Sequence, residues 1–178
     1  MKKFLAVLLM LAMLLCGAAF AEDTAPALTK DVVVLFTSDV HCGIDQGWGY
    51  AGVANMRNSL QADNHVVLVD DGDAIQGETI GTLTKGSAII ELMNAVGYDI
   101  AIPGNHEFDY GSDGLADMLN AAVSSGENLP RMVVCNVDWD AMKKAGLSEG
   151  QKQIYEEFQT YGVKDYTVIQ KGDVKIAV

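Results

Sequence analysis

Apolar residues gather in short continuous runs, separated by stretches in which they recur every three or four positions. The runs are short and rich in β-branched residues, which is typical of strands covered on both faces. They occupy residues 31–38, 66–69, 100–103 and 132–137. The intervening spacing predicts amphipathic helices. These are expected over 51–62, 87–96 and 112–123, with a shorter helix or turn over 79–83. Strand and helix alternate, which predicts an α/β fold with mainly parallel pairing.

The C-terminal part of the chain follows a different pattern. The stretch 141–161 is polar and predicts one helix, around 151–158. Two short apolar runs, 166–170 and 174–178, flank Lys171-Gly172-Asp173 and predict a hairpin. Because a buried strand is an unusual place for a natural terminus, we expect the sequence to be part of a longer protein.

The first 21 residues are organised like a secretory signal peptide. Lys2 and Lys3 precede an apolar run over 4–15, and Ala19-Phe20-Ala21 has the small-x-small form that signal peptidase cuts. A membrane-spanning helix is the alternative, but this run is short for a span. We therefore expect an exported protein (periplasmic, cell-surface or extracellular) whose mature chain begins at Glu22 and has no transmembrane segment.

Within the mature chain, residues 22–30 are predicted to form a polar linker and 31–178 the folded part. A lipid anchor on Cys16 is the alternative to a freely secreted product. Leu15, directly before it, is larger than the residue that lipoprotein signals normally carry there. We therefore favour cleavage after Ala21.

The composition is strongly acidic. Lysine and arginine number 12 against 24 aspartates and glutamates, a formal net charge of −12, and loss of two lysines with the signal peptide takes it to −14. This charge disfavours nucleic-acid polymers and anionic membranes as partners, because both would be repelled. An enzyme acting on anionic substrates would need bound cations to reverse the sign locally.

Cys42 and Cys135 are the cysteines left in the mature chain. Two cysteines of an exported protein can form a disulfide. Both follow apolar strands, however, and small buried thiols are common in such places. We therefore expect free thiols, with a disulfide as the alternative.

Polar clusters follow three of the predicted strands. They are Asp39-Val40-His41, Asp70-Asp71-Gly72-Asp73 and Gly104-Asn105-His106-Glu107-Phe108-Asp109. Each cluster alone is also compatible with an ordinary loop or turn. Because parallel strands end at the same edge of a sheet, we expect the three clusters to share one crevice. Together they supply carboxylates, imidazoles and an amide, which suit zinc, manganese or iron better than calcium.

The clusters resemble the first three motifs of the calcineurin-like metallophosphoesterases, particularly the exported 5′-nucleotidases. The resemblance rests on Asp39-x-His41, on residues 72–77 (Gly-Asp-Ala-Ile-Gln-Gly) and on 104–111 (Gly-Asn-His-Glu-Phe-Asp-Tyr-Gly). It covers about 32–178 and implies part of an α/β/β/α sandwich. The implied activity is hydrolysis of a small-molecule phosphate monoester, above all a nucleotide, at a dinuclear centre whose cations acidify the attacking water.

The resemblance also implies two divalent metal ions and their ligands. Asp39 and His41 would bind the first ion, Asp73 would bridge both, and Asn105 would bind the second. A carboxylate has two oxygens, so a bridging role is within the chemistry of Asp73.

His106 is implied as the catalytic imidazole, which stabilises or protonates the leaving oxygen, with Asp109 as its partner. Residues three apart share a face of a helical turn, so Asp109 can orient His106 and raise its pKa. The alternative is that Asp109 caps the helix expected to begin near Ser112. Glu107 is expected either to support the metal ligands or to be a solvated loop residue.

The later histidine motifs of the family are absent from this sequence. His65 is the one remaining histidine, and about 15 Å of strand separates it from the expected site, so it cannot substitute for the missing ligands. We predict that it is a surface loop residue. The chain alone would then bind one metal weakly and hydrolyse phosphate esters poorly or not at all. A further C-terminal domain is expected in the full-length protein.

Two other functions remain open on the sequence. A 2′,3′-cyclic-nucleotide phosphodiesterase, or another hydrolase of the same fold, would share these early motifs. A non-catalytic, secreted metal-binding fragment is an alternative from a different class.

Overall fold

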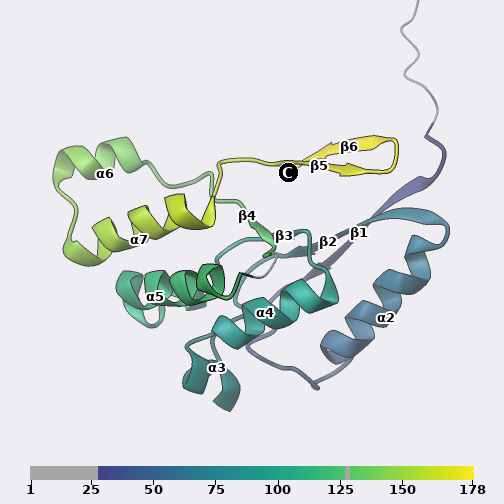
Figure 1. Cartoon of the computed structure of the whole chain (residues 1–178), viewed down its shortest axis with the longest axis horizontal. Coiled ribbons are helices and arrows are strands. Elements are labelled where there is room, and N and C mark those ends of the chain that lie inside the picture. Colours follow the sequence, from purple (N-terminus) through teal and green to yellow (C-terminus); the bar gives the residue numbers. More distant parts are fainter. Residues whose placement is uncertain (1–27, 127–128) are drawn as a thin grey trace, which may run out of the picture.

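A parallel sheet forms the centre of the computed structural model, which describes residues 28–126 and 129–178 (Figure 1). The sheet has four strands in the order β1-β2-β3-β4, all pairs parallel. They are β1 (Asp31–Thr37), β2 (Asn64–Asp70), β3 (Ile100–Ala101) and β4 (Arg131–Met132). The predicted α/β fold with parallel pairing is therefore confirmed. The predicted signal peptide and most of the predicted linker lie outside the described residues.

Helices connect successive strands and cover one face of the sheet, the lower face in Figure 1. They are α2 (Gly49–Gln61), α3 (Thr79–Thr84), α4 (Ser87–Val96) and α5 (Gly111–Ser124). The predicted apolar stripes of α4 and α5 are buried against the sheet. These stripes comprise Ile89, Ile90, Met93, Val96, Leu115, Met118, Leu119 and Ala122. Gly97 ends α4 in the left-handed conformation (φ 89°), which glycine adopts without steric cost.

The predicted C-terminal hairpin is confirmed and lies on the opposite face of the sheet (Figure 1). Strands β5 (Val168–Lys171) and β6 (Val174–Ala177) pair antiparallel. Ile169 of β5 packs with Val67, Ile100 and Val133 in a second, smaller hydrophobic cluster. The hairpin therefore begins a second layer over the central strands.

The prediction that β1 is covered on both faces is wrong for the described residues. β1 is an edge strand, and Val34 and Phe36 are 56% and 71% exposed. Val34 pairs with Val67, which is buried. The hairpin therefore covers β2 on this face but does not extend over β1. An apolar run shows that a strand can be buried on both faces, but not which neighbour supplies the cover.

The polar C-terminal stretch forms two helices where one was predicted, α6 (Trp139–Ala145) and α7 (Glu149–Tyr161). Asp138 caps α6 by accepting from the Ala141 amide, 2.9 Å away. A capping box between Ser148 and Gln151 starts α7, whose Ile154 and Phe158 are buried. In both helices a side-chain cap fixes the residue at which the helix begins. Strands β3 and β4 are also shorter than predicted, at two residues each.

His65 is not the surface loop residue that the sequence predicted. It is the second residue of β2, and its side chain is 11% exposed. Its Nε2 lies 2.6 Å from the carboxylate of Asp173 in the hairpin turn. It still occupies the end of β2 opposite the polar loops, so its exclusion from the predicted site stands.

Cys42 and Cys135 are both free, as predicted; Cys42 is buried and Cys135 exposed. Burial raises the pKa of the Cys42 thiol to about 11, with the charges of Glu107 and Glu78 adding to the shift. Among the described residues, no helix combines the length and apolar character needed to cross a membrane.

Candidate metal centre

The loops that follow β1, β2 and β3 meet backbone to backbone, as the sequence predicted. The amides of Asp39, His41 and Cys42 donate to carbonyls of residues 72–74 over 2.8–3.0 Å. The third loop touches the second so closely that a Cβ at Gly72 would lie 2.6 Å from the Gly104 nitrogen. The three polar clusters therefore meet at the C-terminal edge of the sheet.

Backbone strain is concentrated in these loops. Four of the five non-glycine residues with positive φ in the described part of the chain lie here, namely Asp39, His41, Cys42 and Asp73, with φ between 48° and 61°. Each such conformation costs of the order of 1–3 kcal/mol and persists only where surrounding contacts hold it. Strain of this kind is typical of functional sites, and here the hydrogen bonds between the loops maintain it.

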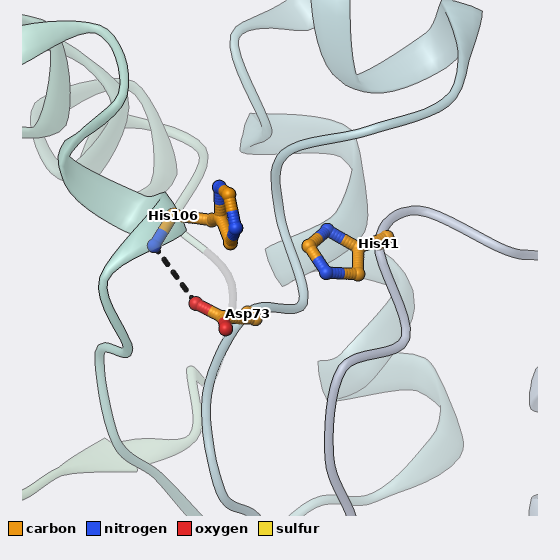
Figure 2. Close-up of side chains that lie close together, drawn as sticks. All are labelled: His41, Asp73 and His106. Carbon is orange, nitrogen blue, oxygen red and sulfur yellow. Dashed lines mark hydrogen bonds between the residues drawn. The ribbon is translucent and has the colours of Figure 1, made fainter.

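His41, Asp73 and His106 come together from the three loops (Figure 2). Each offers a ligand atom within 4.8 Å of the ligand atoms of the other two. The two imidazole rings meet edge to face, with centroids 4.9 Å apart. Two ring nitrogens and a carboxylate oxygen form a donor set that suits zinc and other borderline transition metals.

Hydrogen bonds to the backbone orient the donors of this group. His41 Nδ1 lies 2.9 Å from the carbonyl oxygen of Gln76. A carbonyl can only accept, so Nδ1 carries the proton and Nε2 keeps a lone pair for a cation. Asp73 Oδ1 accepts from the His106 amide at 2.8 Å, the bond drawn in Figure 2, which leaves Oδ2 available.

His106 and Asp109 form the predicted contact, with 2.8 Å between Nδ1 and the carboxylate oxygen Oδ2. This hydrogen bond is the main cause that raises the pKa of His106, and the negative charges of Asp73 and Glu107 act in the same direction. The alternative role for Asp109, as a helix cap, has no support. Helix α5 begins after Tyr110 without any side-chain cap.

Glu107 is buried, at 5% exposure, and is therefore not a solvated loop residue. Its Oε2 accepts from the amides of Asp73 (2.9 Å) and Gly104 (2.6 Å). Its Oε1 accepts from the amides of Ala74 (2.9 Å) and Ile75 (3.2 Å). One carboxylate thus joins the second and third loops.

Two predicted ligands stand apart from the His41, Asp73 and His106 group. Asp39 is exposed, accepts a hydrogen bond from the Ser38 hydroxyl, and does not belong to the group among the described residues. Asn105 is exposed directly before the 3-10 turn η1 (His106–Phe108). Ligand roles for Asp39 and Asn105 stay predictions. His106 also offers a ligand atom to the group, and its predicted catalytic role stays a prediction.

Sequence reasoning missed the partner of His41. The sequence signal for this contact was the dipeptide Gln76-Gly77. Glycine has no side chain, so this segment can pass directly against the first loop, where the Gln76 carbonyl meets His41. A Cβ at Gly77 would lie 2.2 Å from the His41 carbonyl oxygen.

A family model described as calcineurin-like phosphoesterase matches residues 32–171. The chain belongs to this family. Calcineurin-like phosphoesterases use divalent metals, and the His41, Asp73 and His106 group has the donor chemistry for one. The predicted family and fold are therefore confirmed.

Relatives of this calcineurin-like phosphoesterase include nucleotidases of several organisms. The 5′-nucleotidase of Bos taurus is 36% identical over 155 residues, which cover 77% of this chain and 26% of that protein. The trifunctional nucleotide phosphoesterase YfkN of Bacillus subtilis is 29% identical over 89% of this chain and 12% of its own length. The fold resembles a 5′-nucleotidase precursor from Thermus thermophilus (TM-score 0.61, 22% identity, 81% of this chain and 27% of that one). This chain thus spans about a quarter of the length of the 5′-nucleotidases that it matches.

Proposed function

We propose that the chain forms the metal-binding part of an exported phosphoesterase that hydrolyses phosphate monoesters, with 5′-nucleotides as the leading substrate class. The observation that carries the proposal is the convergence of His41, Asp73 and His106 where three parallel strands end. The 5′-nucleotidases among the relatives support the choice of substrate.

In this proposal, His41 and Asp73 are the principal ligands, through Nε2 and Oδ2. Asp39 completes the first site, while Asn105 joins Asp73 at a second. Bound divalent ions would supply charge neutralisation for the phosphate and acidify water. The acidic chain needs such cations, because its own net charge of −12 would repel a phosphate ester.

His106 is the proposed acid. Asp109 accepts the Nδ1 hydrogen, fixes the ring and raises the pKa of His106, which favours the form that also carries a proton on Nε2. That proton is available to the leaving oxygen of the ester. The competing role is that of a third metal ligand, which the position of His106 in the group favours.

The experiment is a calorimetric titration of the chain with Zn²⁺ or Mn²⁺, alongside hydrolysis assays with nitrophenyl phosphate, AMP and 2′,3′-cyclic AMP. We expect one weak site that Asp73→Asn abolishes. Asp71→Asn, an exposed neighbour, is the matched control and should bind like the parent. His106→Ala separates the two roles of this residue. If His106 is only the acid, the variant should bind metal like the parent; if His106 is a ligand, the variant should bind metal more weakly.

Turnover of the chain alone is expected to be slow or absent, since the chain spans only part of its nucleotidase relatives. Rapid hydrolysis with two tightly held ions would contradict the proposed incompleteness of the site. Preference for the cyclic substrate would favour the phosphodiesterase alternative. Metal binding without any hydrolysis, even in a longer version of the protein, would favour the non-catalytic one.

Export is part of the proposal and has its own test. The intact mass of protein recovered outside the cytoplasm should correspond to a chain that begins at Glu22. A mass that includes a diacylglyceryl group on Cys16 would support the lipid anchor instead.

A further inference from the structure

Glu107 carries a carboxylate that is buried. It lies in η1 between His106 and Phe108, both more exposed, yet only 5% of its own surface is accessible. Within the described residues, no lysine or arginine forms an ion pair with it. A buried charge in this situation must be compensated by hydrogen bonds.

Backbone amides supply that compensation in full. A carboxylate has about four lone-pair sites, and each oxygen of Glu107 accepts from two amides. Hydrogen bonds to an ionised acceptor are stronger than those between neutral groups. No neutral side chain of the same shape can accept from all four donors.

The four amides belong to the segments that carry the candidate ligands. Three come from residues 73–75, beginning with Asp73, and the fourth from Gly104, two residues before His106. Asp73 is bonded back to this loop, because its Oδ1 accepts from the His106 amide. The space between the loops is filled, since a Cβ at Gly104 would lie 2.4 Å from Asp73 Oδ1.

We infer that Glu107 is a positioning residue, whose carboxylate holds Asp73 and His106 at ligand distance by gathering the amides of both loops. Its effect on metal affinity rests on the proposed function. Its effect on the geometry of the loops does not, because the amide contacts involve only groups of the chain itself. The two consequences can therefore be measured separately.

Glu107→Gln is the test variant. One carboxylate oxygen becomes an NH₂ group, so two of the four amides face a donor and lose their acceptor. In the parent, the rings of His41 and His106 are close enough for nuclear Overhauser contacts, with centroids 4.9 Å apart. We expect these contacts to weaken or vanish in the variant, with far-UV circular dichroism unchanged. We also expect the Kd for Zn²⁺ or Mn²⁺ to rise by about 10–100-fold, the usual cost of losing a group that orients metal ligands.

Glu91→Gln, an exposed glutamate of α4, is the matched control and should change neither readout. If Glu107 only stabilises the fold, Glu107→Gln should lower the thermal midpoint but leave the ring contacts and the Kd at parental values. That result would overturn the inference. If the parent binds no metal, the proposed function fails, while the ring contacts still decide the role of Glu107.

The parent alone provides a test should the variant not fold. The amides of Asp73, Ala74, Ile75 and Gly104 should exchange with solvent much more slowly than those of the exposed loop 45–48. Exchange of all four at the rate of that loop would overturn the inference.

Discussion

Asp70 ends β2 as a carboxylate that is only 2% exposed, beneath the loops of the candidate metal centre. Its Oδ1 accepts from the hydroxyl of Thr37 at 2.9 Å, and its Oδ2 from the amide of Gly72 at 3.2 Å. The hydroxyl oxygen of Thr37 in turn lies 2.9 Å from the phenol oxygen of Tyr98. Burial raises the pKa of Asp70 from 3.8 to about 7, despite these hydrogen bonds, which lower it.

A raised carboxyl pKa means that the folded chain binds this proton more tightly than the unfolded chain. The stabilisation is complete below the unfolded value near 3.8 and is lost as pH rises through about 7. At 1.36 kcal/mol per unit, a shift of about three units corresponds to about 4 kcal/mol of unfolding free energy lost by pH 8. This is a large share of the stability of an ordinary domain.

Asp70→Asn removes this titration while keeping the shape of the side chain. The asparagine oxygen can accept from Gly72, and its NH₂ group can donate to Thr37, whose hydrogen then turns to Tyr98. The amide oxygen, the NH₂ group and the hydroxyls of Thr37 and Tyr98 then each keep at least one hydrogen-bond partner. The variant should therefore be more stable than the parent at pH 8 and close to it near pH 4.

Urea unfolding at pH 5 and pH 8, in the presence of a chelator, measures the difference. We expect the stability gap between variant and parent to widen by about 3 kcal/mol between these two pH values. Asp71→Asn, the exposed neighbour, should show no comparable widening. A gap that stays constant with pH would refute the assignment of a protonated, buried Asp70.

Three further predictions concern the loops and the thiols. Asp109→Asn removes the acceptor that favours the imidazolium form, so the pKa of His106 from an NMR titration should fall; an unchanged pKa would contradict the pairing. Gly104→Ala places a Cβ 2.4 Å from Asp73 Oδ1 and should weaken metal binding about tenfold or more, whereas Gly150→Ala in α7, with no atom nearer than 3.6 Å, should bind metal like the parent. In the protein beginning at Glu22, Ellman's reagent should modify one thiol of the folded chain, exposed Cys135, and both after unfolding, because Cys42 is buried; two fast thiols would contradict that burial.

Much of the architecture follows from patterns that the sequence carries directly. The apolar spacing of α4 and α5 predicted which of their residues are buried, and Gly97 marked the end of α4. The meeting of the three polar clusters followed from one rule, that parallel strands end at a common edge. The contact between His106 and Asp109 needed only their three-residue spacing.

Features that depend on partners distant in sequence could not be predicted in this way. The exposed side of β1 depends on where the hairpin stops, which no local pattern encodes. The burial of Glu107 involves three amides that lie 32–34 residues away in sequence, and amides carry no sequence signature. Caps set where α6 and α7 begin, in a stretch that holds few apolar residues.

The central claim is that a divalent metal binds where His41, Asp73 and His106 converge, and paramagnetic NMR with Mn²⁺ tests it directly. The chain has three histidines, so the ring signals of His41 and His106 can be compared with those of His65, at the far end of β2. We expect substoichiometric Mn²⁺ to broaden the signals of His41 and His106 while sparing His65, and Asp73→Asn to abolish the effect. Equal broadening of all three histidines, or none, would contradict the claim.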